Sequence, residues 1–501
     1  MHHVQGDARM LESRRVLGIL RGCLRRARRD AERSLRLVEI SAQVAWVCHA
    51  GTFVLPDAET VLREHAGLSD PLATVAADAR RVEHRTLHVV TEAYAIGGHT
   101  RLVKRWIDLI DDETHAVVLV RQRHGFDPAW IIPQGRDVPC IDLEGERVGP
   151  RARVARLIAM FQAARRVILH IHPDDACAVA AAYRSPRADI HFLNHADHVA
   201  WLGAGLPAVL LNLRHRGTRL AESRRGIAAA ACGVVPVPIT PPAAIDRDEA
   251  RERLGIGAHE RVILTIASGY KYNAVGGRSL LEPLDRVLRR RDTRLVAVGP
   301  EPGHPVFAAL AERHPGRVLC MGTVQVSAAH RAAADVYLDS YPFASITSML
   351  ESAALGTPVV AYQPDRDELE ILYSECPWFP PDAYAAGDPG RLVEMLDERL
   401  DDEALRRDLS ARNQAGMAMH FPEAWRTAIR AHLSRDVPKV PWRGRGIGFR
   451  DDRVDRVLSG LMENVRTYTR QPDSLGLDHV GLWWLRWCTF AGLIGRQSVT
   501  R

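Results

Sequence analysis

Residues 336–360 read VYLDSYPFASITSMLESAALGTPVV, and this stretch decides the fold. A short apolar run ends at Asp339, and a turn built on Pro342 follows it. Small hydroxyl residues then open a helix, which Gly356 and Pro358 terminate before a second apolar run begins. A strand, a helix and a further strand in direct succession predict a crossover unit of a parallel sheet.

The same alternation extends from this stretch in both directions. Apolar runs predict five strands of one series, at 262–267, 294–298, 318–321, 336–338 and 358–362. A series nearer the N-terminus is predicted at 87–91, 116–120, 167–171, 190–193 and 208–213. The Pro-rich segment 235–242 (VPVPITPP) separates the two series and is predicted to be a linker. The chain is therefore predicted to be α/β, with two doubly wound domains whose strands point their carboxyl ends into a cleft.

The domain organisation follows from these patterns. A helical N-terminal extension is expected at 1–85, a first Rossmann-like domain at 86–240, a second at 241–435 and a helical tail at 436–501. In the extension, Leu17, Leu20 and Leu24 recur at helical spacing among many arginines. Such a helix packs on its own protein, which we favour, or lies on anionic lipid.

The composition excludes several classes of protein. Of 501 residues, 46% are hydrophobic and 26% charged, as in soluble globular proteins. A net charge of +6 with 6% aromatic residues argues against a nucleic-acid partner. Eight scattered cysteines with no CxxC pair predict free thiols. Without a secretory signal or an apolar run of about 20 residues, we expect a cytoplasmic protein, with peripheral contact at the inner face of the membrane as an open alternative.

The segment after Asp339 carries the side chains of an anion site. Ser345, Thr347 and Ser348 stand where the predicted helix begins. Unpaired backbone N–H groups and the positive end of the helix dipole favour a negative charge there, and hydroxyls add donors. Glu351 lies one turn further on and is placed to accept hydrogen bonds from a ribose. The alternative is that the hydroxyl residues only cap the helix, with Glu351 in solvent.

Lysine is rare in this chain, so the position of each lysine is informative. Only three of the 67 basic residues are lysine, a bias typical of a GC-rich genome. Lys271 follows the predicted strand 262–267 in a turn with Gly269 and Tyr270, where a compact cation would meet a phosphate. Tyr270, in the same turn, is a second candidate for binding the phosphate-bearing ligand. The alternative for Lys271 is an ordinary surface lysine.

Histidines gather after two predicted strands of the first domain: His170, His172, His195 and His198. Because histidine titrates near neutral pH, His195 or His198 is predicted to act as a general base, oriented by Asp197 or Asp174. A metal site that combines the histidines with one of these carboxylates is the alternative functional interpretation. A histidine that is merely hydrogen-bonded near a strand end is equally compatible with each position.

A glycine pair follows the first predicted strand of the first domain. Gly97, Gly98 and His99 lie between this strand and the next predicted helix. The position suits a loop that faces a ligand across the cleft. His99 is placed either to reach a sugar or to begin the helix without a ligand.

Together these residues resemble the nucleotide-sugar-dependent glycosyltransferases of the GT-B fold. The group most similar contains O-GlcNAc-transferase-like enzymes and, more broadly, bacterial surface-glycan glycosyltransferases. The resemblance implies that Lys271, Thr347 and Ser348 hold the donor diphosphate and that Glu351 binds the ribose. It also implies that the first domain (86–240) binds the acceptor and the second (241–435) the nucleotide-sugar donor, and that the Gly97-Gly98 loop faces the sugar. The resemblance is clear at 262–365 and fainter at 86–215.

The resemblance also predicts an activity. The expected reaction moves a hexosyl or N-acetylhexosaminyl group from a nucleotide-diphosphate sugar to a glycan, lipid-linked or protein acceptor, in polysaccharide biosynthesis. It implies no metal and no other cofactor. Two alternatives stay open: a nucleotide-sugar epimerase of the same fold, and a metal-dependent hydrolase that uses the histidine group.

Overall fold

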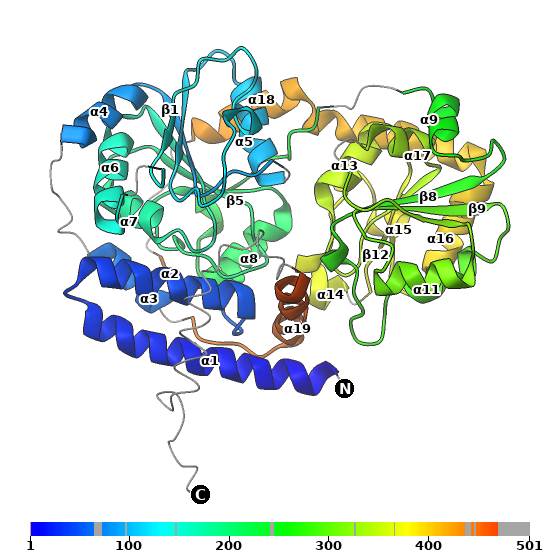
Figure 1. Cartoon of the computed structure of the whole chain (residues 1–501), viewed down its shortest axis with the longest axis horizontal. Helices are drawn as coiled ribbons and strands as arrows, with labels where there is room; N and C mark the ends of the chain where they lie inside the picture. The colour runs from blue at the N-terminus through cyan, green and yellow to red at the C-terminus, as the bar shows by residue number, and fades with distance from the viewer. Residues whose placement is uncertain are drawn as a thin grey trace, which may run out of the picture.

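The computed structural model describes residues 2–64, 73–95, 98–145, 148–240, 245–324, 327–364, 366–435, 442–444 and 447–468. Within them the chain forms two parallel sheets, each with helices on both faces, side by side in Figure 1. This is the predicted α/β architecture of two doubly wound domains.

The first sheet has the strand order β3-β2-β1-β4-β5-β6-β7 and is parallel throughout. Leu87 and Val89 of β1 pack toward helix α6, whereas Val90 packs with Val103 of α5 on the opposite face. This alternation follows from the period of two along a strand. The strands are β1 (Thr86–Val90), β2 (His115–Leu119), β3 (Cys140–Asp142), β4 (Arg166–His170), β5 (Ile190–Asn194), β6 (Val209–Asn212) and β7 (Cys232–Val234). The helices are α5 (Gly98–Leu109), α6 (Pro150–Ala163), α7 (Ala176–Arg184) and α8 (His215–Arg225).

The second sheet has the order β10-β9-β8-β11-β12-β13 and is also parallel. Its two faces bury separate clusters, one around Ile263 and Leu295 and one around Leu264 and Tyr337. The strands are β8 (Arg261–Ile266), β9 (Thr293–Val298), β10 (Val318–Cys320), β11 (Val336–Leu338), β12 (Val359–Tyr362) and β13 (Ala385–Ala386). The helices are α9 (Arg247–Arg253), α10 (Leu281–Val287), α11 (Pro305–Arg313), α12 (Ala328–Ala333), α13 (Ile346–Ala354), α14 (Arg366–Leu369), α15 (Pro381–Tyr384), α16 (Pro389–Asp401) and α17 (Glu403–Met417).

The N-terminal helices share one core with the first domain. They are α1 (His2–Ala27), α2 (Ala31–Cys48), α3 (Pro56–Glu64) and α4 (Ala73–Val82). Leu20, Leu24 and Val38 belong to the same buried cluster as Val167 of β4. The apolar stripe of α1 is therefore used within the protein, as the packing interpretation expected.

Two helices near the C-terminus return to earlier parts of the chain. Helix α19 (Arg453–Tyr468) contacts α1 and α2, and its Leu458 joins a buried cluster of the second domain. Helix α18 (Pro422–Leu433) lies beside α5 on the first sheet (Figure 1), where Trp425 meets Trp106 edge to face with ring centroids 5.5 Å apart. Although α18 falls within the expected 241–435 unit, its core contacts are with the first domain.

Within the described residues, two segments that lead from one domain to the other are hydrogen-bonded to each other. The backbone N–H of Ile239 donates to the carbonyl of His420, and Nδ1 of His420 donates to the carbonyl of Val237, both at 2.9 Å. The second domain is thus inserted between β7 and α18 of the first.

The described residues contain neither a helix suited to cross a membrane nor a disulfide bond. No helix in the described ranges combines the length and apolarity that a bilayer crossing needs. The seven cysteines in these ranges are free thiols. The aromatic segment 483–490 (WWLRWCTF) of the expected C-terminal tail lies outside the described residues.

Candidate functional site

Lys271 lies where the second sheet ends, close to the start of α13. It closes a single helical turn, Gly269–Lys271, directly after β8, and Nζ donates to the carbonyl of Ala344 at 2.9 Å. Ala344 immediately precedes Ser345, the N-cap of α13. Burial lowers the pKa of Lys271, the Asp339 carboxylate opposes this, and Arg214 adds a smaller lowering effect. Tyr270 is half-buried in the same turn.

Asp339 shapes the loop that leads into α13. Its Oδ1 accepts from the backbone N–H groups of Ser340 and Ser345, both at 2.9 Å, and Oδ2 accepts from the hydroxyl of Ser374 at 2.8 Å. Burial raises the pKa of this carboxyl, and these hydrogen bonds together with Lys271 counter the effect. The carboxylate therefore fixes the position at which the helix begins.

The start of α13 offers donors to a ligand. Ser345 occupies the N-cap position, yet its side chain makes no capping hydrogen bond. The first helical bond runs from Met349 N to Ser345 O, so the amides of residues 346–348 have no acceptor within the helix. The hydroxyl residues Thr347 and Ser348 stand in the same turn. The simple capping interpretation thus does not describe Ser345.

A second helix start faces this one from the first domain. A Cβ placed on Gly98, the first residue of α5, would lie 3.8 Å from Oγ1 of Thr347. The N-termini of α5 and α13 therefore meet at the junction of the domains, and each carries the positive end of a helix dipole. Lys271 adds a full charge beside them. Gly97 lies outside the described residues.

Glu351 joins the two domains. Its Oε1 accepts from Nη2 of Arg105 on α5 at 3.1 Å, and its Oε2 accepts from Nη2 of Arg331 at 2.9 Å. Arg105 also donates to the carbonyl of Pro238 at 2.9 Å. A ribose at this carboxylate would share it with the two guanidinium groups or displace Arg105.

His195 and His99 lie together at the carboxyl end of the first sheet. Both are half-buried, and their ring centroids are 4.1 Å apart. Nε2 of His99 donates to the carbonyl of His170 at 2.9 Å, and Nε2 of His195 lies 3.2 Å from Nδ1 of His170. Burial lowers the pKa of His99 to about 4 and holds that of His195 well below its ordinary value, so both are neutral at pH 7.

His198 stands beside the second domain. Its ring packs against Phe343 with centroids 5.6 Å apart, and its Nδ1 lies 3.6 Å from Asp197 Oδ1. Asp197 is already held by Arg214 through two hydrogen bonds, of 2.6 and 2.7 Å.

The carboxylates do not orient His195 as the sequence predicted. Asp174 bonds Arg121 at 2.7 Å and Gln43 at 2.8 Å, and Asp197 bonds Arg214. These buried carboxylates lie next to arginines, and each ion pair satisfies a charge that would otherwise be unpaired. The side chain within hydrogen-bond distance of the His195 ring is another histidine, His170.

The metal interpretation fits this donor set poorly. His99, His170 and His195 each bring a ring nitrogen within 4.8 Å of the others. Both ring nitrogens of His170 are nevertheless used, in contacts of 3.1 Å to His88 and 3.2 Å to His195. The carboxylates expected to complete the set are paired with arginines. A metal ion would have to break these bonds before it could bind.

Arginines hold the two domains together and surround Glu351, and sequence reasoning missed Arg105 and Arg331 among them. Arg214 donates to the carbonyls of Ile371 (2.6 Å) and Tyr373 (2.7 Å) of the second domain. Arg105 and Arg331 bracket Glu351. In a chain with so many arginines, composition gives no signal that separates Arg105 and Arg331 from the rest.

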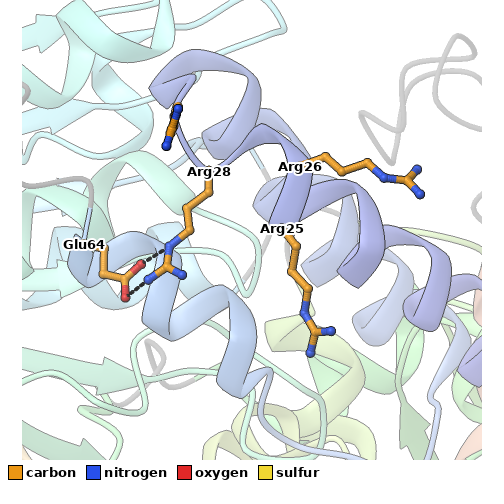
Figure 2. A pocket seen from close by; sticks show the side chains of 5 residues that line it. Arg25, Arg26, Arg28 and Glu64 are labelled. Carbon is orange, nitrogen blue, oxygen red and sulfur yellow. Dashed lines mark hydrogen bonds and ion pairs between the residues drawn. The ribbon is translucent and has the colours of Figure 1, made fainter.

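The N-terminal helices carry a basic hollow far from this junction. Arg25, Arg26, Arg28 and Arg29 line it together with Glu64. Figure 2 shows Arg28 turned toward Glu64, to which it is ion-paired, while Arg25 and Arg26 point away from each other. The guanidinium groups therefore do not converge on one point, and the hollow is not a candidate anion site.

Comparison with known proteins supports the fold assignment. No family model matches the chain, and neither does any curated sequence. Among solved structures, HepE of Anabaena, crystallised with UDP and glucose, has a TM-score of 0.52 at 14% identity and covers 70% of this chain and 100% of its own. A glycosyltransferase of Rickettsia africae has a TM-score of 0.50 at 13% identity, over 78% of this chain and 100% of its own.

A third similar structure carries a different name. The N-terminal domain of trehalose-6-phosphate phosphatase from Candida albicans has a TM-score of 0.50 at 11% identity and covers 70% of this chain and 97% of its own. Identities this low show a common fold and nothing about substrates. The two parallel sheets, the facing helix starts and these likenesses together show that the chain has the GT-B fold.

Proposed function

We propose that this protein is a glycosyltransferase that moves a sugar from a nucleoside-diphosphate sugar to an acceptor. The observation that carries the proposal is the close approach of two helix N-termini, of α5 and α13, beside Lys271. A diphosphate is the ligand that this arrangement suits best, because it brings two negative charges to a site built from N–H donors, hydroxyls and one ammonium group.

The donor would lie on the second domain. Thr347, Ser348 and the free amides of α13 would bind the diphosphate, Lys271 would neutralise it, and Glu351 would accept from the ribose. Tyr270 and Ser345 line the same loops. Similar solved structures support a nucleotide-sugar donor, since HepE was crystallised with UDP and with UDP-glucose.

The acceptor would approach from the first domain. His195, whose pKa is lowered by burial, or His198 would take a proton from the attacking group, while Gly98 and His99 would border the sugar. Lys271 and the two helix dipoles stabilise the departing nucleoside diphosphate, so the proposed reaction requires no metal cofactor. We propose a glycan, lipid-linked or protein acceptor in cell-surface glycan synthesis and a cytoplasmic location, with hexosyl or N-acetylhexosaminyl donors.

A thermal-shift screen against nucleoside diphosphates and their sugar derivatives tests the proposal. A ligand at 100 times its dissociation constant should stabilise the protein by about 2.7 kcal/mol. Binders are then incubated with and without candidate acceptors, and the products are analysed. A glycosylated acceptor supports the proposal, whereas an epimerised donor formed without acceptor identifies an epimerase. Activity that a chelator abolishes and zinc restores identifies the metal-dependent hydrolase instead.

A further inference from the structure

Four histidines form a continuous hydrogen-bonded string through the first domain, and only its last member, His195, is partly exposed. Nε2 of His115 lies 2.7 Å from the carbonyl of Ile110. Nδ1 of His115 lies 3.1 Å from Nε2 of His88, and Nδ1 of His88 lies 3.1 Å from Nε2 of His170. Nδ1 of His170 then lies 3.2 Å from Nε2 of His195.

The string crosses the sheet from its amino edge to its carboxyl edge. His115 pairs in register with Thr86, the first residue of β1, and His170 pairs with Val90, the last. His88 stands midway between them on the same face. Trp106 of α5 covers it, with ring centroids 5.8 Å from His88 and 5.6 Å from His170. His88 and His170 are fully buried, so water does not interrupt the string there.

One backbone carbonyl fixes the proton on every ring. The oxygen of Ile110 can only accept, so Nε2 of His115 carries the hydrogen and its Nδ1 presents a lone pair. His88 must then donate from Nε2 to His115, which leaves its own Nδ1 to accept from Nε2–H of His170. By the same rule His195 donates from Nε2 to His170. Its Nδ1 is therefore left as a bare lone pair.

The rings are neutral, as this logic requires. Burial holds the pKa of His88, of His170 and of His195 well below the ordinary histidine value, and neighbouring histidines lower each further. Burial also lowers the pKa of His115. In the described part of the chain, Nδ1 of His195 makes no hydrogen bond.

We propose that His115, His88 and His170 are positioning residues that hold His195 in its Nε2–H tautomer, so that its Nδ1 receives the acceptor's proton. The inference rests on the proposed glycosyl transfer. In that step the acceptor's O–H or N–H bond breaks and the proton goes to Nδ1 of His195. The freed electron pair forms the bond to the anomeric carbon, and the bond from that carbon to the diphosphate oxygen breaks with its pair on the diphosphate.

The tautomer can be measured without any turnover. Long-range ¹⁵N–¹H spectra of protein labelled with ¹⁵N-histidine distinguish a bare ring nitrogen from a protonated one, and single His→Gln variants assign the signals. We expect a bare Nδ1 and a protonated Nε2 for all four histidines of the string. A protonated Nδ1 on His195 in the wild-type protein, or a shift of its signals when zinc is added at stoichiometric concentration, would overturn the proposal.

Three variants connect the tautomer to the reaction. His88→Leu removes the middle link, so His195 should become a mixture of tautomers and kcat should fall about 10²-fold, the size of a general-base contribution, with KM for the sugar nucleotide unchanged. His88→Gln keeps one donor and one acceptor, and it should restore both the spectrum and most of kcat. His191→Gln is the matched control, because His191 is equally buried on β5 but bonds Asp189 outside the string.

The outcomes separate this inference from the function on which it rests. A wild-type protein that turns over no sugar nucleotide overturns the proposed function, whatever its histidine spectrum shows. If the enzyme is active and His88→Leu changes the spectrum while kcat stays within twofold of the wild type, the positioning role is overturned alone. If His88→Leu fails to fold, the comparison of His88→Gln with the wild-type spectrum still decides the tautomer.

Discussion

Replacing Lys271 with methionine tests the electrostatic basis of donor binding. Methionine keeps most of the length of the side chain and removes its charge. A charge-assisted hydrogen bond to a phosphate is worth about 1.5–3 kcal/mol, and each 1.36 kcal/mol corresponds to a tenfold change in affinity. Because Lys271 is half-buried beside α13, salt screens it only in part. We therefore expect Lys271→Met to weaken nucleoside-diphosphate binding about 10- to 150-fold in isothermal titration calorimetry.

The chain provides a matched control for this experiment. Lys104 lies in α5 and also donates to a backbone carbonyl, that of Ala129, but it stands away from the helix starts. Lys104→Met should leave the affinity within twofold of the wild type. Denaturation of the free proteins checks that loss of the cation beside Asp339 has not unfolded the second domain. Equal affinities for the two folded variants would refute the role assigned to Lys271.

Three further changes probe the site and the core. Glu351→Gln should weaken nucleoside-diphosphate binding about tenfold by calorimetry, because an amide accepts ribose hydroxyls less strongly than a carboxylate, and unchanged affinity would contradict the ribose role. Asp197→Asn should cost about 3 kcal/mol of unfolding free energy at pH 7, since it breaks a buried ion pair with Arg214. Burial alone would raise the pKa of Asp197, but Arg214 holds it below the usual range. The loss of unfolding free energy in Asp197→Asn should therefore persist above about pH 4 and shrink as the pH falls further. A loss that does not depend on pH would exclude this cause. Trp425→Ala should cost about 3–5 kcal/mol in urea unfolding, and a loss under 1 kcal/mol would show that α18 does not complete the first core.

Long apolar strands and glycine- or proline-marked turns made most of the fold predictable. The predicted strand 262–267 is displaced by one residue from β8, and the predicted strand 190–193 ends one residue before β5 does. The strands that sequence reasoning missed are β3, β7 and β13, each of two or three residues. A strand this short shows no period, so sequence reasoning finds it only where the residues are apolar and a turn follows, as in β10 and β11 but not in these three.

The candidate site was predictable only where position along the chain determines position in space. Lys271 and Thr347 follow strands of one parallel sheet, so both had to lie at its carboxyl edge. The contact of Arg105 with Glu351 joins α5 to α13, and no local pattern encodes such a long-range pair. The partner of His195 was mistaken for the same reason: a nearby carboxylate looked more plausible than His170 on a neighbouring strand.

The return of α18 has a consequence for how the protein is made. During synthesis the first domain emerges before the second, and domains generally fold in that order. Here, however, Trp106 and Leu211 are covered by Trp425 and Ile429, which the ribosome adds only after the whole second domain. The domain that begins to fold first is thus still incomplete when the second sheet has been made, and a nascent chain that stops before residue 433 leaves an apolar surface open to chaperones and to aggregation.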